Sequence, residues 1–198
     1  MKPSVTVVAV IAALAVSCAS VDSDASESAG QHTQKESTMN YRGLKVYPDR
    51  ALSVVNQDSQ GVAAKGYDMV ALFDRKQLVT GSPDFSVRRL DATWYFANEA
   101  NRAQFSASPD RFMPQYGGYC SWSVANDSEL PPSPGDPSAY DFVAGKLYFK
   151  YNKMVRFLWR LASAKYIHKA DARWPMFQDT IKAYVADADV QPTRGAPK

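Results

Sequence analysis

The sequence predicts an α+β domain in which a small antiparallel sheet, built from hairpins, packs with several helices and in which the C-terminal part is helical. Two patterns support this fold class. Short runs of β-branched and aromatic residues alternate with Gly, Pro and Asp turns through the middle of the chain, which is typical of hairpins. After Tyr151 the apolar residues instead recur at helical spacing. A hydrophobic content of 45% in 198 residues is sufficient for a packed core.

The first residues have the pattern of an export signal. Lys2 precedes an apolar run, Val5–Val16, that fits a signal peptide and is too short to span a bilayer. The run leads into Cys18 in a string that resembles the lipobox of bacterial lipoproteins. We therefore expect residues 1–18 to be a lipoprotein signal peptide with Cys18 lipidated, and an ordinary signal peptide cut near Ala19 is the alternative. In a host with two membranes, Ala19 after the cysteine favours the outer membrane, facing the periplasm.

Composition divides the remaining chain into three parts. Residues 19–39 are rich in Ser, Asp, Glu, Gln and Ala and lack apolar periodicity, so we expect a flexible tether. Residues 40–186 are aromatic and periodic, and we expect them to form one folded domain. Residues 187–198 are expected to be a frayed tail.

Two groups of strands are expected in the domain, because their β-branched and aromatic residues favour pairing and Gly, Pro and Asp turns separate them. The expected strands of the first group are Val70–Phe73, Gln77–Val79, Phe85–Leu90 and Thr93–Phe96. Those of the second hairpin are Asp141–Val143 and Leu147–Phe149.

Helices are expected between and after these strands. Asn98 should cap a helix over Ala100–Ala107 that Pro109 ends. Residues Glu129–Pro137 contain four prolines and a glycine, which predicts an exposed loop without regular structure. Later helices are expected after Tyr151, over Ala164–Ala170, and from Pro175 onward.

The helix after Tyr151 has a broad apolar face and a basic side. Lys153, Arg156 and Arg160 share that basic side, which we expect to be a solvated face. Contact of these residues with anionic lipid head groups is a second interpretation, because the chain is expected to be tethered to a membrane.

Charge and motifs exclude several classes of function. The 23 basic and 20 acidic residues give a net charge of +3, which is too balanced for a nucleic-acid partner. The sequence contains no Ser-His-Asp pattern, glycine-rich phosphate loop or nucleotide fingerprint, so a hydrolase or a nucleotide-binding enzyme is unsupported.

Four strings together resemble the YHS domain-containing (seleno)protein family of exported bacterial proteins. They are Gly66–Ala71, Pro114–Cys120, Gly145–Tyr148 and Lys169–Pro175. The strings cover residues 62–177 in the family's order. Some members of the family resemble selenoproteins with selenocysteine at the position of Cys120, which implies chalcogen chemistry there.

The chain also departs from the broader YHS pattern. Residues Phe96–Phe105 keep the framework of its metal-binding segment but lack both cysteines, so a multi-cysteine metal site is excluded. Tyr140 stands where relatives tend to have Trp, and Lys150 stands where they tend to have Asn. The first change is conservative, whereas the second alters a polar position.

Cys120 is the candidate catalytic residue. Cys18 and Cys120 are the only cysteines, so lipidation of Cys18 leaves a lone thiol. If a helix begins beside Cys120, its amide groups would lower the thiol pKa and favour the thiolate. The thiolate could then react through a sulfenic acid and a mixed disulfide with an external thiol. Alternatively, Cys120 is a small buried hydrophobic residue without chemistry.

The remaining candidates surround Cys120 or belong to the same strings. Candidate cofactor-binding residues are Tyr116, Gly117, Gly118, Tyr119, Asp68 and Trp174. A mononuclear site for a soft ion such as copper would combine Cys120 with His168 and Asp171.

Two hypotheses for function follow. In the first, the protein is an exported lipoprotein that handles a metal ion or thiol redox equivalents at Cys120, as an accessory to an external thiol or a metal-handling partner. In the second, the domain is a non-catalytic module that binds a ligand or partner, and Cys120 is buried.

Overall fold

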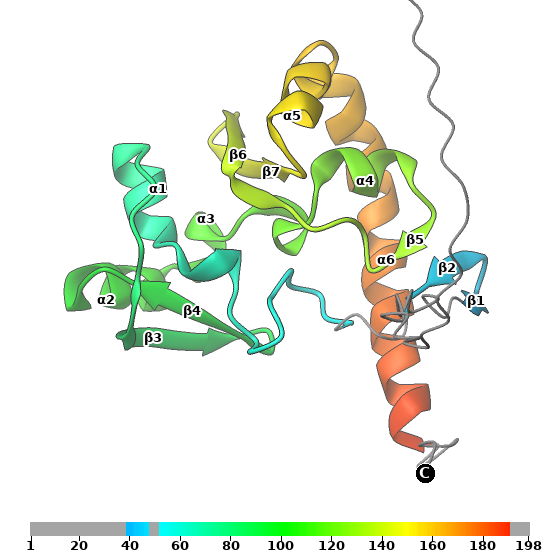
Figure 1. Ribbon diagram of the computed structural model, residues 1–198, viewed down its shortest axis with the longest axis horizontal. Coiled ribbons are helices and arrows are strands. Elements are labelled where there is room, and N and C mark those ends of the chain that lie inside the picture. The colour runs from blue at the N-terminus through cyan, green and yellow to red at the C-terminus, as the bar shows by residue number, and fades with distance from the viewer. Residues whose placement is uncertain (1–38, 48–51, 191–198) are drawn as a thin grey trace, which may run out of the picture. The chain divides into compact units, whose positions relative to one another are not determined.

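The computed structural model describes residues 39–47 and 52–190, all of which belong to one compact unit. These residues form the expected α+β fold, with small sheets and a long C-terminal helix (Figure 1). The predicted signal peptide, the lipidation of Cys18 and nearly all of the predicted tether lie outside the described residues. The predicted tail lies partly outside them.

The strands form three separate small sheets. The first has the order β1-β2-β5, in which β1 (Met39–Tyr41) and β2 (Leu44–Val46) are antiparallel and β5 (Glu129–Leu130) runs parallel to β2. The other two are the expected hairpins, β3 (Ser82–Arg89) with β4 (Ala92–Phe96) and β6 (Asp136–Val143) with β7 (Lys146–Lys150). Alternate residues of β4 are buried, as the pleat of a half-covered strand requires.

The helices α2 (Glu99–Ala107) and α5 (Lys153–Arg160) are confirmed, and each begins at an asparagine. Asn98 Oδ1 accepts from the amide of Asn101 at 2.9 Å, and Asn152 Oδ1 accepts from the amide of Val155 at 2.9 Å. Pro109 does more than end α2, because it is the first residue of the short helix α3 (Pro109–Phe112), where a missing amide hydrogen costs nothing.

The first predicted strand is wrong. Residues 70–73 belong to the helix α1 (Met69–Arg75), whose first turn is capped by Asp68. Both faces of this segment are buried, so its apolar run has no periodicity that distinguishes a helix from a strand. The predicted strand Gln77–Val79 is also absent, and in this region only Thr80 pairs, through an isolated bridge to Tyr67.

Two further predictions are wrong in part. The proline-rich segment Glu129–Pro137 contains β5 and the start of β6. The last two predicted helices are a single helix, α6 (Ser163–Val190), which continues through Pro175 and beyond the expected start of the tail. The remaining helix, α4 (Ser121–Asn126), follows Cys120 directly and packs against α6.

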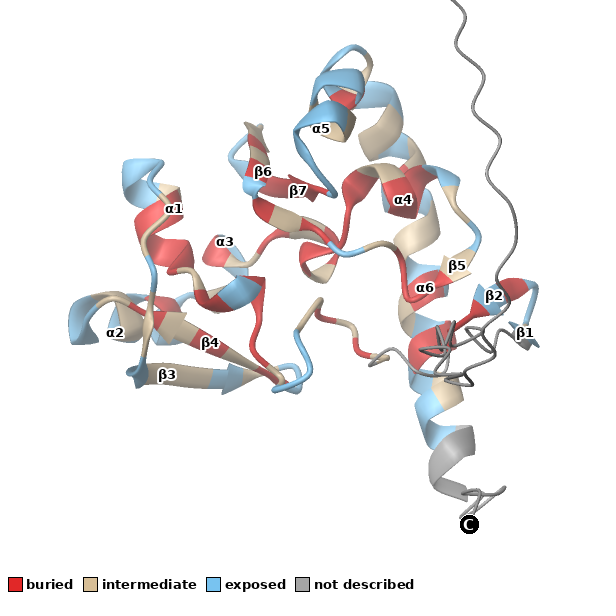
Figure 2. Cartoon of the chain, in the orientation of Figure 1, coloured by how far each residue is buried: buried red, intermediate tan, exposed pale blue. Residues whose placement is uncertain are grey.

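The buried apolar residues form two clusters, and Figure 2 marks the buried positions in red along the chain. One is built around Trp94, Phe96 and Phe105, where the β3–β4 hairpin meets α1, α2 and α3. The other is built around Tyr148, Trp159 and Phe177, where β7, α4, α5 and α6 meet. The segment that contains Tyr116 and Cys120 runs alongside both clusters, and it carries most of the residues predicted to be functional.

Candidate functional site

The segment before Cys120 has an unusual backbone. Tyr116 and Gly117 lie in a short 3-10 turn, η2 (Gln115–Gly118), and both have left-handed dihedral angles, with φ of 56° and 60°. The carbonyl of Gly117 accepts the amide of Asn56 at 2.8 Å. A Cβ on Gly117 would lie 1.9 Å from the carbonyl oxygen of Val54. Glycine is therefore required at position 117 by both conformation and space.

Tyr116 is a non-glycine residue in a conformation that L-residues rarely adopt, and its side chain is anchored. Its hydroxyl donates to Asp171 Oδ1 at 2.8 Å, and its ring centroid lies 6.0 Å from that of Trp174. Burial, together with the hydrogen bond to Asp171, raises the pKa of Tyr116. The phenol therefore remains a hydrogen-bond donor at physiological pH. Strained residues that the surroundings hold in place are concentrated at functional sites.

The side chains of Tyr116, Asp171 and Trp174 line a cavity of about 260 Å³, which we call the Tyr116 pocket. Its wall is completed by Val54, Leu90, Asp110, Met113, Pro114, Gln115, Gly117, Pro175 and Gln178. The structure thus brings together four predicted site residues that come from two strings, Pro114–Cys120 and Lys169–Pro175. Among the described residues that line this pocket there are two carboxylates and no Lys, Arg or His.

Pro175 also lines the Tyr116 pocket and removes one backbone hydrogen bond from α6. Proline has no amide hydrogen, so in α6 it leaves the backbone carbonyl of residue 171, four positions earlier, without its helical donor. Residue 171 is Asp171, and both Asp171 and Pro175 line the Tyr116 pocket. Asp171 is exposed, so a ligand in the pocket can reach its carboxylate.

Tyr119 and Gly118 do not line the Tyr116 pocket. The Tyr119 hydroxyl donates to the carbonyl of Ser53 at 2.8 Å, and burial raises the pKa of this phenol. Tyr119 lines a second cavity of about 440 Å³, whose wall includes the prolines of residues 131–134 and Tyr151. A Cβ on Gly118 would meet the rings of Pro114 and Phe149. These two residues therefore position the backbone between the cavities.

Cys120 is buried, with 1% of its surface exposed. Its amide donates to the carbonyl of Ser133 at 2.9 Å, and the residue bridges to Phe149. Burial raises the pKa of the Cys120 thiol, although backbone amides of Ser123, Tyr151 and Trp122 act in the opposite direction. The expectation of a lowered pKa is therefore wrong. A helix does begin beside the thiol, as anticipated, but removal from water outweighs its amide groups.

Asp68 has a structural role. It is fully buried and accepts hydrogen bonds from the amide of Ala71 at 2.9 Å, the amide of Ala97 at 2.8 Å and the side chain of Asn101 at 2.6 Å. These bonds join the start of α1 to the end of β4 and to α2. Asp68 therefore holds the fold together and is separate from the Tyr116 pocket.

The residues predicted to hold a metal do not form a cluster. His168 is exposed on α6, Asp171 accepts from Tyr116, and Cys120 is buried. Within residues 39–47 and 52–190, no group of three or more His, Cys, Asp and Glu side chains is placed to hold a metal ion. The copper hypothesis for these three residues therefore gains no support from their positions.

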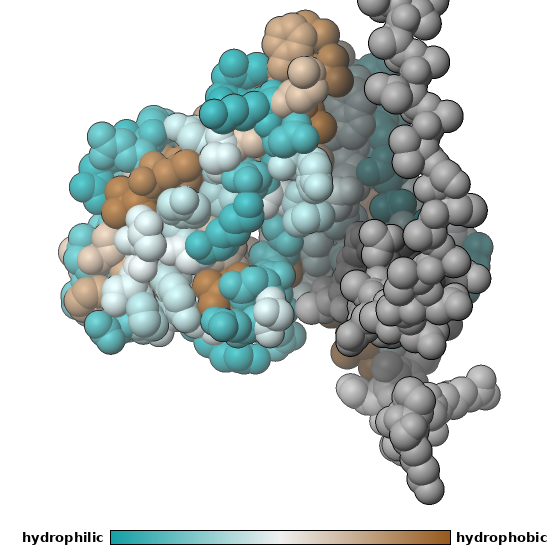
Figure 3. Space-filling model, viewed as in Figure 1, coloured by the Kyte–Doolittle hydropathy of each residue, from teal (hydrophilic) through white to brown (hydrophobic). Residues whose placement is uncertain are grey.

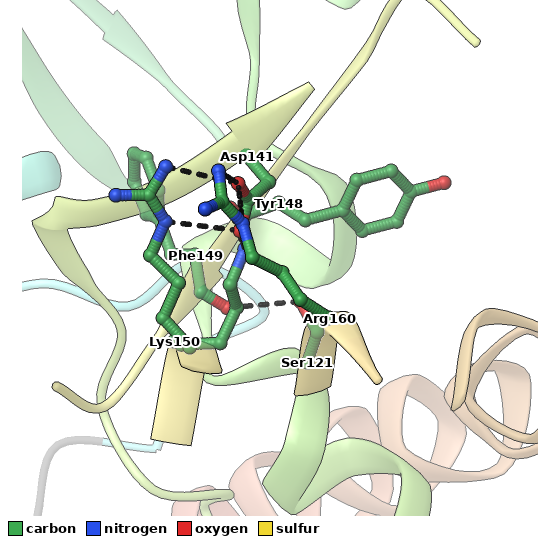
Figure 4. A network of polar contacts seen from close by, with 7 residues as sticks. Ser121, Asp141, Tyr148, Phe149, Lys150 and Arg160 are labelled. Atoms are coloured by element: carbon green, nitrogen blue, oxygen red, sulfur yellow. Dashed lines mark hydrogen bonds and ion pairs between the residues drawn. The ribbon is translucent and has the colours of Figure 1, made fainter. Parts of the chain in front are cut away.

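A cluster of charged side chains joins α5 to the β6–β7 hairpin, and the sequence did not predict it (Figure 4). Asp141 on β6 pairs with three cations: Lys150 at 2.6 Å, Arg156 at 3.0 Å and Arg160 at 2.6 Å. Lys153 and Arg160 are exposed, as expected for a solvated face, whereas Arg156 is only partly exposed, and both arginines also pair with Asp141, which was not expected. The only signal in the sequence was Lys150, noted as a departure from relatives. We call these four residues the Asp141 cluster.

Lys150 is fully buried in this cluster, and its ammonium lies 4.2 Å from the ring centroid of Trp159. Burial lowers the pKa of Lys150 to about 8. Burial acts to raise the pKa of Asp141, but hydrogen bonds from Arg156 and Lys150 outweigh it and hold that pKa at about 2. The carboxylate therefore stays charged and fixes α5 to the β6–β7 hairpin.

No helix in the described part of the chain is both long enough and apolar enough to cross a membrane. Comparisons with protein-family models, with curated proteins and with solved structures found no match to this chain. The resemblance to the YHS family therefore stays a prediction, and the Tyr116 pocket has to be interpreted from its own chemistry.

Proposed function

We propose that the domain is a non-catalytic binding module that holds a small organic ammonium ion in the Tyr116 pocket. We further propose that it is exported and anchored through a lipid on Cys18 to the outer membrane, facing the periplasm. The observation that carries the binding proposal is the Tyr116–Asp171 hydrogen bond at 2.8 Å in the wall of a cavity that also contains Trp174.

The chemistry of the wall supports a cationic ligand. Asp171 supplies a carboxylate, so a ligand that donates hydrogen bonds fits there. Tyr116 and Trp174 supply aromatic rings, whose faces attract cations. Asp110 adds negative charge, although Arg89 pairs with it at 2.7 Å. The volume of about 260 Å³ restricts the ligand to a small molecule.

The first hypothesis, thiol redox or metal handling at Cys120, has less support. A redox thiol needs thiolate character and access, and the sulfur has neither a lowered pKa nor an exposed surface. The second hypothesis requires a buried Cys120 and a pocket formed by neighbouring aromatic residues, and both features are present.

Calorimetric titration with three probes tests this proposal. Ethanolammonium and choline carry a positive charge, and 3,3-dimethylbutan-1-ol is the neutral analogue of choline. We expect both cations to bind, the neutral alcohol to bind at least about tenfold more weakly, and the Trp fluorescence to change on binding, because Trp174 lines the pocket.

The matched variants are Asp171→Asn and Asp179→Asn. Both positions are exposed on α6, but only residue 171 lines the pocket. Asparagine keeps an oxygen that accepts from Tyr116, so Asp171→Asn removes the charge with little effect on the fold. We expect it to weaken cation binding by about tenfold or more, and Asp179→Asn to leave it unchanged. Equal binding of the alcohol and choline, or no effect of Asp171→Asn, would refute the proposal.

A further inference from the structure

The outer face of α5 consists of exposed apolar side chains. Met154, Phe157, Leu158 and Leu161 are 66%, 60%, 40% and 71% exposed. Their spacing of three, four and seven residues places them in one stripe along the helix. Figure 3 shows this apolar patch at the position that α5 occupies in Figure 1. A contiguous patch of this kind marks an interaction surface in a soluble domain.

The Asp141 cluster determines which way this stripe points. Arg156 and Arg160 lie on the side of α5 opposite the stripe, and both are bound to Asp141. Trp159 is buried beneath the helix beside Lys150. With its polar side and its tryptophan fixed to the domain, α5 cannot turn its apolar stripe inward.

The charge of the chain segment that contains α5 favours an anionic partner. Residues 142–170 contain seven Lys and Arg residues and no Asp or Glu. The seven are Lys146, Lys150, Lys153, Arg156, Arg160, Lys165 and Lys169. In the Asp141 cluster three cations face one carboxylate, so the cluster keeps an excess of positive charge.

We propose that α5 is an interfacial membrane-binding helix, which inserts the apolar stripe among the acyl chains of an anionic lipid surface while exposed basic residues of α5 and α6, such as Lys153 and Lys165, contact the head groups. Amphipathic helices with a basic polar side bind membranes in this way. A second copy of the chain is disfavoured as the occupant, because a symmetric contact through α5 would bring the two basic surfaces together.

The chain outside the structure also favours a membrane. If Cys18 is lipidated, as proposed above, 20 residues (19–38) join the lipid to β1, and a tether of that length with the composition predicted from the sequence would span roughly 25 Å on average. The domain then remains close enough to the bilayer for α5 to reach it, at a high effective concentration. The membrane contact is independent of the ligand in the Tyr116 pocket.

A fluorescent label on α5 tests this inference in the full chain carrying Cys18→Ser. Met154→Cys places a thiol in the stripe, and Ala103→Cys places a matched thiol on the exposed side of α2. Each is labelled with a polarity-sensitive dye and mixed with vesicles of phosphatidylcholine alone or with 30% phosphatidylglycerol. The readout is local, so attachment of residues 1–17 to the vesicles does not mimic it.

We expect a blue shift of the dye at residue 154 with anionic vesicles, a shift at least twofold smaller with neutral vesicles, and none at residue 103. Adding Phe157→Ser and Leu161→Ser should remove most of the shift at residue 154, and thermal unfolding should confirm that this variant is folded. The inference is overturned if residue 154 does not respond to anionic vesicles or responds no more than residue 103. A shift without vesicles that grows with protein concentration would indicate self-association and would also overturn it.

Discussion

Cys120 is a residue whose neighbours decide its chemistry. The three backbone amides near its sulfur would stabilise a thiolate in water, yet burial keeps the thiol protonated. The selenocysteine resemblance predicted a reactive position, and no pattern in the sequence reported the bridge to Phe149 that helps to bury it. Burial of a single side chain depends on long-range pairing and is therefore difficult to predict from sequence.

The burial of Cys120 predicts slow alkylation. In the Cys18→Ser chain, iodoacetamide should modify Cys120 at least about a hundredfold more slowly in the native protein than in urea, because modification requires opening of the structure. The same chain with Met154→Cys supplies an exposed thiol as a control. Modification of native Cys120 at the rate of this control would show that the sulfur is accessible.

Gly117 and Gly145 separate two reasons for which a position requires glycine, namely a positive φ and a lack of space for a Cβ atom. Both have positive φ, at 60° and 75°, but only at Gly117 would a Cβ collide with another atom, the carbonyl oxygen of Val54. We expect Gly117→Ala to lower the free energy of unfolding by more than about 3 kcal/mol, and Gly145→Ala by about 1 kcal/mol. Urea denaturation measures both values. Equal losses would mean that the segment moves away from Val54 without cost.

At the scale of elements, the Asp141 cluster connects α5 to the β6–β7 hairpin. Asp141→Asn leaves the buried Lys150 ammonium without its carboxylate, so we expect a loss of about 3 kcal/mol of stability. Lys150→Met should cost less than about 1 kcal/mol, because Arg156 and Arg160 still pair with Asp141. If the two variants lose equal stability, the buried charge is not what makes Asp141 necessary.

The same cluster predicts acid sensitivity. The pKa of Asp141 is lower in the folded protein, about 2, than its ordinary value of 3.8, so between these pH values the unfolded chain binds more protons. The stabilisation is complete above about pH 4 and is lost as the pH falls toward 2. Thermal unfolding at pH 5, 4, 3 and 2 should show a decline in the wild type that is smaller in Asp141→Asn.

Some helices and strands could be predicted from the sequence and others could not. The two hairpins were predictable, because Asp91 and Ala144-Gly145 turn the chain between runs of β-branched and aromatic residues. The helix α1 was not, because four consecutive residues at its start, Met69–Leu72, are all buried and show no helical periodicity. Pro175 was expected to divide a helix, but α6 is continuous through it and packs against α4.

At the scale of the whole molecule, the candidate site is assembled from distant segments. Tyr116 and Asp171 are 55 residues apart, and they were predicted separately as members of two strings. The strings contain Tyr116, Gly117, Asp171 and Trp174, which line the Tyr116 pocket, and also Asp68, whose carboxylate instead accepts from the amides of Ala71 and Ala97. Sequence patterns gave no information on which members of the strings meet, because that depends on how α6 packs beside the turn η2.

The proposed anchor gives a prediction for the intact chain in cells. Wild-type protein should carry a fatty-acid label and should require detergent for extraction from membranes. Cys18→Ser should lose the label and be released by 1 M salt more readily than the wild type, because salt screens the head-group contacts of α5 and leaves only its short apolar stripe in the membrane. Release of the wild type by salt alone would contradict lipidation, and a lipid label on Cys18→Ser would place the lipid elsewhere.

The pairing of β2 with β5 has a mechanical consequence. The amides of Lys45 and Tyr47 donate to the carbonyls of Ser128 and Leu130, and Leu44 and Val46 are buried. Any pull transmitted from the N-terminal side arrives at β1 and β2 before it reaches the other described elements. These few hydrogen bonds and apolar contacts would therefore bear the load, and they would yield before the Tyr116 pocket was stretched.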